Sequence, residues 1–260
     1  MATPTVREWL RERPFALGLS SGFFGFFAHA GLVSVLEDEG LHPARLAGSS
    51  AGALVAGLWA SGVGAARMRD ELFALRREHF WDPGPGLGLL RGRLFRERLE
   101  ALLGVPTFER CPVPVAVSVF DVLARRTRVV AEGELAPALV ASCAVPFLFH
   151  PVWSGGRPLL DGGIADRPGV LGLPEGERAL HHHLASRSPW RRAGGASMEA
   201  PRRRGLVALV LGEMPRVGPF RLEQGPRAFD AARRAAREAL ELPVVGVEGE
   251  VVWAGRRGGG

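Results

Sequence analysis

The chain has 260 residues, enough to bury a substantial core, and α/β folds of this size are commonly one domain. Its 33 Lys and Arg residues against 27 Asp and Glu give a net charge of +6, and all 33 are arginine, which we attribute first to a GC-rich codon bias. The sequence contains no module typical of nucleic-acid recognition, so we expect no nucleic-acid partner. Cys111 and Cys143 lack metal-ligand spacing and are expected to be reduced thiols.

The N-terminal segment does not have the pattern of an export signal. Residues 1–14 carry several charges and no signal-peptide core, which predicts a cytoplasmic protein. Residues 18–36 are uncharged over nearly the length of a membrane span. The glycines, the serines and His29 within that stretch favour a strand, a loop and a helix over residues 32–39 instead.

Two copies of a Gly-x-Ser-x-Gly pattern follow. The first is Gly18-Leu19-Ser20-Ser21-Gly22, after an apolar run, and the second is Gly48-Ser49-Ser50-Ala51-Gly52. In the second copy an apolar helix begins at once, as in a nucleophile elbow, where a strained turn exposes a serine between small residues. The first copy opens into a glycine-punctuated loop that can present backbone N–H groups to an anion. We therefore expect Ser50 to be a nucleophile and the first copy to form an oxyanion hole.

The remaining elements follow from periodicity and turn residues. We expect an amphipathic helix over 65–80, a flexible loop over 82–88, helices over 93–103, 134–142 and 229–240, paired strands over 113–120 and 127–131, a hairpin over 152–160, a buried strand over 206–211 and an edge strand within 244–253. Asp161 comes directly after the second hairpin strand, where a strand end can carry its side chain into a site.

Four segments together resemble the patatin-like phospholipase family. These are the loop and helix over 18–40, the elbow around Ser50, the block over 141–151 and Asp161-Gly162-Gly163, and the resemblance covers about residues 15–170. It implies a three-layer α/β/α fold with a mostly parallel sheet, forming one domain over 1–260. It also implies a Ser50/Asp161 dyad and an oxyanion hole on the backbone of Gly22, Phe23 and Phe24. The supporting glycines of the motifs would be Gly48, Gly52, Gly162 and Gly163. No metal or organic cofactor is implied.

The glycine-rich loop departs from the family pattern. Phe23 and Gly25 stand where the family usually has a third glycine and then Lys or Arg, and Phe26 stands where a glycine is common. The phenylalanines of this loop either line an acyl-chain site or pack inward against the sheet. A backbone N–H needs no particular side chain, so the expected oxyanion donors survive the change.

His181, His182 and His183 offer an alternative base, because a histidine after Asp161 would complete the Ser, Asp, His order of α/β-hydrolases. The competing interpretation is a solvated strand or loop. Arginines gathered late in the chain, in a Pro/Gly/Ser-rich stretch, suggest either a surface loop or contact with anionic lipid headgroups; they are Arg187, Arg191, Arg192, Arg202, Arg203 and Arg204.

The resemblance implies a serine acyl hydrolase that acts on a fatty-acyl ester such as a phospholipid, with peripheral contact at an anionic membrane as a further expectation. Because the loop is altered, a second hypothesis remains open: a lipid-binding or regulatory protein that keeps the fold but has lost efficient turnover.

Overall fold

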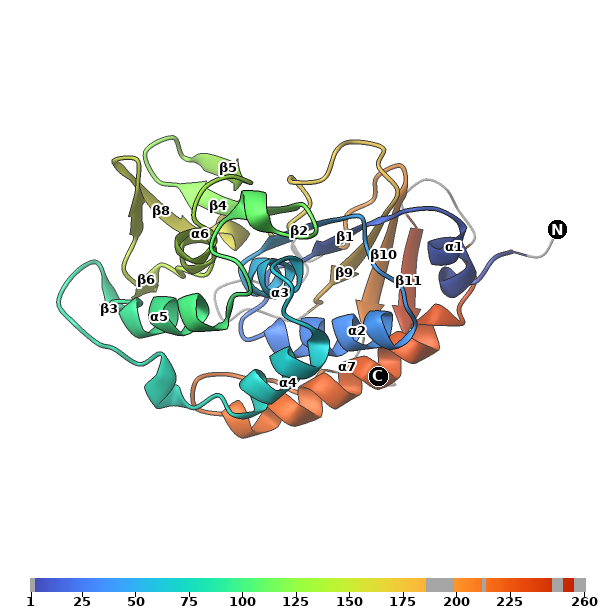
Figure 1. The fold of residues 1–260 in the computed structure, drawn as a ribbon, viewed down its shortest axis with the longest axis horizontal. Helices are drawn as coiled ribbons and strands as arrows, with labels where there is room; N and C mark the ends of the chain where they lie inside the picture. The colour runs from blue at the N-terminus through green and yellow to red at the C-terminus, as the bar shows by residue number, and fades with distance from the viewer. Residues whose placement is uncertain (1–2, 186–198, 212–213, 245–249, 255–260) are drawn as a thin grey trace.

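The computed structural model describes residues 3–185, 199–211, 214–244 and 250–254 (Figure 1). A nine-stranded sheet runs in the order β11-β10-β9-β1-β2-β4-β8-β7, with β5 paired to β4. Its strands are β1 (Ala16–Leu19), β2 (Arg45–Ser49), β4 (Val115–Asp121), β5 (Arg126–Val130), β7 (Val152–Ser154), β8 (Arg157–Asp161), β9 (Ala179–His183), β10 (Leu206–Leu211) and β11 (Glu250–Ala254). A separate ribbon pairs β3 (Gly88–Leu90) with β6 (Phe147–Phe149).

The central strands are parallel and one end of the sheet is antiparallel. The pairings β11-β10, β10-β9, β9-β1, β1-β2 and β2-β4 are parallel, whereas β8 pairs antiparallel with β4 and with β7. The helices are α1 (Val6–Glu12), α2 (Phe26–Asp38), α3 (Ala51–Ala60), α4 (Ala65–Phe73), α5 (Arg93–Leu102), α6 (Leu135–Ser142) and α7 (Gly225–Leu240). The expected α/β class, with a mostly parallel sheet flanked by helices, is confirmed.

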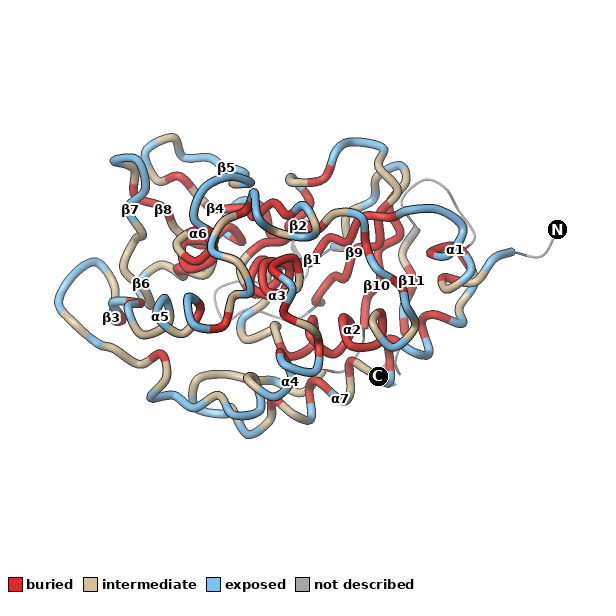
Figure 2. The backbone as a smooth tube through the Cα atoms, viewed as in Figure 1, coloured by how far each residue is buried: buried red, intermediate tan, exposed pale blue. Residues whose placement is uncertain are grey.

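The largest core lies between the sheet and the helices. Figure 2 shows buried backbone along the central strands, α2 and α3. Helix α2 approaches α7 closely at Gly31, where a Cβ would lie 2.5 Å from the Phe229 carbonyl oxygen. A smaller cluster of alanines from the central strands lies under Val170 and Leu173, so this part of the sheet is covered by the segment after β8.

Two expected helices differ from the structure by six or more residues at one end, whereas α7 begins four residues before the expected 229. The helix expected over 65–80 ends at Phe73, because only Ala65 and Met68 bury their side chains along it; Arg76 is extended, and a single 3-10 turn, η1 (Arg77–His79), follows. Helix α2 begins at Phe26, six positions before the expected start at Leu32. The expected hairpin over 152–160 and the expected strand over 206–211 are confirmed.

The three consecutive histidines correct the interpretation of a solvated segment. They lie on β9, between β1 and β10 in the middle of the sheet, and all three are fully buried. The polarity of this segment suggested exposure, but the strand can be buried because the rings of His181 and His182 have hydrogen-bond partners inside the protein. Searched over the described residues, the helices include none that is long and apolar enough to cross a membrane.

Candidate active site

Ser50 occupies the sharp turn between β2 and α3. Its φ of 52° and ψ of −121° are strained for a residue with a side chain. The glycines on either side allow this turn: a Cβ on Gly48 would lie 2.5 Å from the Gly52 carbonyl carbon, and a Cβ on Gly52 would lie 2.1 Å from the Leu19 carbonyl oxygen. The local geometry therefore holds the Ser50 side chain at the end of the strand, in front of the N-terminus of α3.

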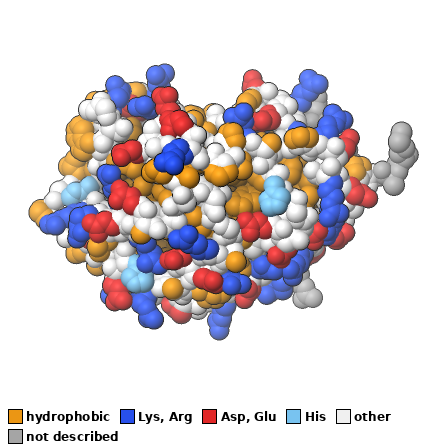
Figure 3. All heavy atoms as spheres, in the orientation of Figure 1, with side chains coloured by type: hydrophobic (Ala, Val, Ile, Leu, Met, Phe, Trp, Pro, Cys, Tyr) orange, Lys and Arg blue, Asp and Glu red, His pale blue; other side chains and the backbone are white. Residues whose placement is uncertain are grey.

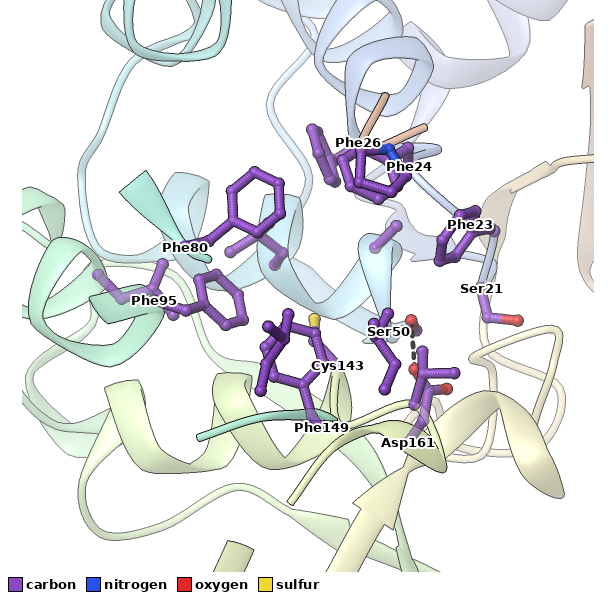
Figure 4. Close-up of a pocket in the computed structure, with 18 of the residues that line it drawn as sticks. Ser21, Phe23, Phe24, Phe26, Ser50, Phe80, Phe95, Cys143, Phe149 and Asp161 are labelled. Carbon is purple, nitrogen blue, oxygen red and sulfur yellow. Dashed lines mark hydrogen bonds between the residues drawn. The ribbon is translucent and has the colours of Figure 1, made fainter. Parts of the chain in front are cut away.

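Asp161 ends β8 and meets Ser50 from the neighbouring part of the sheet (Figure 4). The Ser50 hydroxyl donates a hydrogen bond of 2.7 Å to Asp161 Oδ2. The other carboxylate oxygen, Oδ1, accepts from the backbone N–H of Gly163 at 2.7 Å. Gly162 lets the chain turn there, since its Cβ would lie 2.0 Å from the Ser118 carbonyl oxygen. These contacts fix the carboxylate with one oxygen aimed at the serine.

Ser142 is a supporting residue that the sequence analysis did not single out. Its hydroxyl oxygen accepts a 2.9 Å hydrogen bond from the backbone N–H of Ser50 and its own proton goes to the Ser118 carbonyl at 2.7 Å. Ser142 is fully buried at the end of α6. The only signal for it was its place in the block over 141–151.

The loop after β1 faces the same site. Phe24 has a φ of 56°, and Gly25 closes a turn by donating to the Gly22 carbonyl. Within the described part of the chain, no acceptor takes a hydrogen bond from the backbone N–H of Gly22, Phe23 or Phe24. All three residues line the pocket that contains Ser50 and Asp161. The loop can therefore offer backbone donors to a negatively charged group in that pocket.

Ser20, the serine of the first glycine-flanked copy, lies outside the pocket. It is fully buried, and its hydroxyl oxygen accepts from the Leu184 backbone N–H at 2.9 Å. Its carbonyl oxygen lies 2.8 Å from His29 Nε2. These bonds tie the end of β1 to α2 and to the residue after β9, which anchors the loop that follows.

A pocket of about 500 Å³ extends from Ser50 between α3, α4 and α5. Its wall is overwhelmingly apolar and includes Leu54 and Leu58 on α3. Leu58 lies about 12 Å along the helix from Ser50 at 1.5 Å per residue. Figure 4 shows the rings of Phe80, Phe95 and Phe149 around this space.

The loop phenylalanines divide between the two expected roles. Phe27 is buried, and Gly225 on α7 is adjacent to its ring. Phe23, Phe24 and Phe26 instead line the pocket, and Phe24 and Phe26 lie 5.3 Å apart between ring centroids. One ring therefore packs inward and three face the cavity.

The buried histidines form a network behind the loop. Because His29 Nε2 faces a carbonyl, it must carry the proton in the neutral ring, so His29 Nδ1 accepts from His182 Nδ1 at 2.9 Å. Burial lowers the pKa of His29 to about 4 and that of His181 to about 3, and it holds the pKa of His182 well below its ordinary value. His181 Nε2 faces the Pro168 carbonyl at 2.8 Å. The bonds of these rings lie in the sheet interior, whereas Ser50 bonds to Asp161.

Two other side chains bear on the site, and a third, Arg203, lies away from it. Arg167 lines the pocket and donates to the Leu184 carbonyl, so a guanidinium stands near the loop that lacks the family cation. Cys143 also lines the pocket, but burial and then the Asp161 charge raise the pKa of its thiol well above the ordinary value. Arg203 donates to the carbonyls of Val170 and Leu173.

The other late arginines fall partly outside the described residues: Arg187, Arg191 and Arg192 lie in 186–198. Among the side chains that the structure describes, no group of three or more His, Cys, Asp or Glu is arranged to hold a metal ion.

The comparisons with known proteins agree with this architecture. Residues 17–173 match the family model described as patatin-like phospholipase. Uncharacterized NTE family proteins of Mycobacterium tuberculosis (strain ATCC 25618 / H37Rv) and Mycobacterium bovis (strain ATCC BAA-935 / AF2122/97) are each 32% identical over 157 residues. That match covers 58% of this chain and 43% of each relative, so the chain spans under half of their length.

Among solved structures, VipD from Legionella pneumophila has a similar fold, with a TM-score of 0.61. The two sequences are 15% identical, and the similarity covers 87% of this chain and 66% of VipD. It therefore supports the fold alone.

Proposed function

The chain belongs to the patatin-like phospholipase family, and on that premise we propose that it is a serine lipid acyl hydrolase with a Ser50/Asp161 dyad. Family membership implies lipid hydrolase activity in general. The proposal for the dyad rests on one observation above all: Ser50, whose backbone is strained, donates a 2.7 Å hydrogen bond to Asp161 Oδ2. The other oxygen of that carboxylate, Oδ1, is held by the backbone N–H of Gly163.

In the proposed first step, Ser50 Oγ attacks the carbonyl carbon of a fatty-acyl ester while its proton passes to Asp161 Oδ2. The carbonyl electron pair moves to oxygen, and the backbone N–H groups of Gly22, Phe23 and Phe24 stabilise the resulting oxyanion. When the tetrahedral intermediate collapses, the ester C–O bond breaks and the leaving alkoxide takes the proton from Asp161. The products are an acyl-serine and a free alcohol.

The second step regenerates the serine. A water molecule attacks the acyl-serine carbonyl, with Asp161 taking its proton, and collapse returns that proton to Ser50 Oγ as the fatty acid leaves. The hydrogen bond from the Gly163 backbone N–H to Asp161 Oδ1 keeps the other oxygen, Oδ2, directed at Ser50 in both steps.

The pocket supports a long apolar acyl group as the substrate part next to Ser50. The wall between Ser50 and Leu58 is long enough for roughly ten carbon atoms, since a single bond of about 1.5 Å advances an extended chain by about 1.25 Å. We propose a phospholipid or another polar lipid as the source of that chain, and one domain over 1–260 as the unit that acts on it.

Covalent labelling with a fluorophosphonate tests this proposal against the alternative of an inactive lipid-binding protein. We expect stoichiometric labelling of the native protein at Ser50, equal labelling of Ser20→Ala, and none of Ser50→Ala. A parallel assay with a fatty-acyl ester should show turnover only in the two proteins that label. A folded native protein that neither labels nor hydrolyses the ester would favour the lipid-binding alternative.

A further inference from the structure

Exposed apolar side chains surround the pocket. Phe23, Phe147 and Ile164 line the pocket and are nonetheless exposed to solvent. Leu89 precedes the lining residue Leu90, and the Phe220 ring lies 5.8 Å from that of the lining residue Trp81. With Leu87 they form what we call the apolar rim: Phe23, Leu87, Leu89, Phe147, Ile164 and Phe220. Segments far apart in the sequence thus contribute apolar surface to one place.

The β3-β6 ribbon connects this rim with the pocket. Leu90 and Phe149 are register partners on the two strands, and both line the pocket. Leu89 on β3 is exposed, Phe147 on β6 is exposed although it also lines the pocket, and Leu87 just before β3 is 74% exposed. The ribbon therefore has apolar side chains both in the pocket and on the outer surface.

Phe147 is held outward at a cost. Its φ of 66° lies in the left-handed region that a bulky residue seldom adopts, and its side chain is 83% exposed. Neither the backbone nor the ring gains from this position in water, since burial would favour the ring. Such a conformation is expected where the ring has an apolar partner outside the protein.

Two arginines lie beside the rim, although the exposed Glu78 and Glu223 are also nearby in the sequence. The Arg77 guanidinium lies over the rings of both Phe220 and Trp81, 5.2 and 5.5 Å from their centroids. Arg91 is exposed directly after Leu90. The nearby Asp82 carboxylate accepts from the backbone N–H groups of Gly92, Arg93 and Leu94 and so caps α5. Arginines paired with aromatic rings suit a boundary where one side is apolar and the other carries anionic groups.

We propose that the apolar rim is a docking surface for an anionic phospholipid bilayer, with its rings inserted among the acyl chains and Arg77 and Arg91 at the headgroups. The inference rests on the proposed function, because an acyl chain drawn from a bilayer at the rim reaches Ser50 along a continuous apolar path. Figure 3 shows hydrophobic side chains interspersed with charged ones on the face seen in Figure 1.

Vesicle sedimentation tests the surface without chemistry if every variant is made in the Ser50→Ala chain. Vesicles of equal parts phosphatidylcholine and phosphatidylglycerol should bind the parent, and Leu87→Ser with Phe220→Ser should weaken that binding about tenfold or more. These two side chains are 74% and 70% exposed and do not line the pocket. Leu123→Ser with Leu171→Ser, at 62% and 57% exposure away from the pocket, is the matched control and should bind like the parent.

The outcomes separate the docking surface from the enzyme. With Ser50 restored, the Leu87→Ser/Phe220→Ser protein should hydrolyse a short, monomeric ester at the rate of the native protein. Equal vesicle binding by the rim variant and the control variant would overturn the docking surface and leave the hydrolase intact. Rim-dependent binding by a protein that hydrolyses no ester would keep the surface and refute the proposed function. A lipid-free dimer, seen by sedimentation velocity and dissociated by the rim variant, would show that the rim binds a second copy instead.

Discussion

The same five-residue pattern occurs at the ends of two neighbouring parallel strands, with opposite results. At the end of β2 the helix begins at Ala51, so Ser50 is forced into a strained turn and projects into the pocket. At the end of β1 the helix begins only at Phe26, so Ser20 continues the strand and is buried against Leu184. The number of residues between the serine and the start of the helix, more than the motif itself, determines which serine side chain faces the pocket.

The two copies also depend on each other. A Cβ on Gly52 would lie within 2.1 Å of the Leu19 carbonyl oxygen and 2.7 Å of that of Ser20. The turn of the second copy therefore packs so closely against the end of the first that Gly52 leaves no room for a side chain. The comparison predicts that variants in the two copies affect different properties of the protein.

The largest expected difference is between Ser50→Ala, which should affect catalysis, and Ser20→Ala, which should affect stability. Ser50→Ala removes the proposed nucleophile and should lower ester hydrolysis on the order of 10⁶-fold where chemistry limits the rate, with little change in melting temperature. Ser20→Ala should keep turnover within several-fold. It leaves the buried Leu184 N–H without its acceptor, which costs about 1–3 kcal/mol of unfolding free energy. Equal loss of activity in both variants would overturn the assignment.

The proposed base is tested by Asp161→Asn, which keeps the shape of the site but removes its proton acceptor. We expect kcat to fall roughly 10⁴-fold with the protein still folded, leaving the contribution of the oxyanion hole and binding. His181→Gln, also in the sheet next to the first copy, should retain most turnover in the protein that remains folded, because a dyad needs no imidazole. Inactivity of a folded His181→Gln protein, measured in the same assay, would point to a histidine base.

The contact between the two copies can be broken by one methyl group. Gly52→Ala must push α3 away from the backbone of Leu19, and a displacement near 1 Å at Ser50 should cost about 10²-fold in kcat/KM. Gly64→Ala is the matched control. Its Cβ would have the Glu37 carboxylate as its nearest neighbour, at 3.8 Å, and the φ of Gly64 is ordinary for any residue. If the two variants had equal activity, the close packing of the copies would not position Ser50.

The sequence was sufficient where a local pattern determines a local structure. The elbow, the glycines after Asp161 and the buried strand over 206–211 all follow from small residues or apolar runs within a few positions. The proximity of Ser50 and Asp161 could be expected only through the family resemblance, because it depends on β8 pairing with β4 rather than on any short-range signal.

Features that depend on distant partners could not be predicted in this way. The three histidines of β9 have the polarity of an exposed segment, and only His29, the Pro168 carbonyl and the flanking strands explain their burial. Ser142 is an ordinary serine until α6 brings it to the Ser50 backbone. The β3-β6 ribbon joins two three-residue strands that no periodicity could reveal.

The last prediction is a pH dependence of stability that comes from the buried histidines beside the first copy. In the folded protein the pKa of His29 lies near 4, mainly because of burial, against 6.5 for an exposed histidine, so the unfolded chain binds more protons between those values. Stability should therefore be complete above about pH 6.5 and fall as the pH drops toward 4, by up to about 1.4 kcal/mol per pH unit for each such histidine.

The main physical reason for that loss is that a charged imidazolium would be desolvated in the sheet interior. A proton added to His29 Nδ1 would also face the proton of His182 Nδ1 at 2.9 Å, and the bond to the Ser20 carbonyl offsets this only in part. His182→Leu removes one of the titrating groups. The free energy of unfolding, measured by urea unfolding at each pH from 7 to 4.5, should therefore fall less steeply with decreasing pH than in the native protein. The exposed His42 is the control, and His42→Gln should leave the slope unchanged. Identical slopes for all three proteins would mean that the buried histidines do not make the fold sensitive to acid.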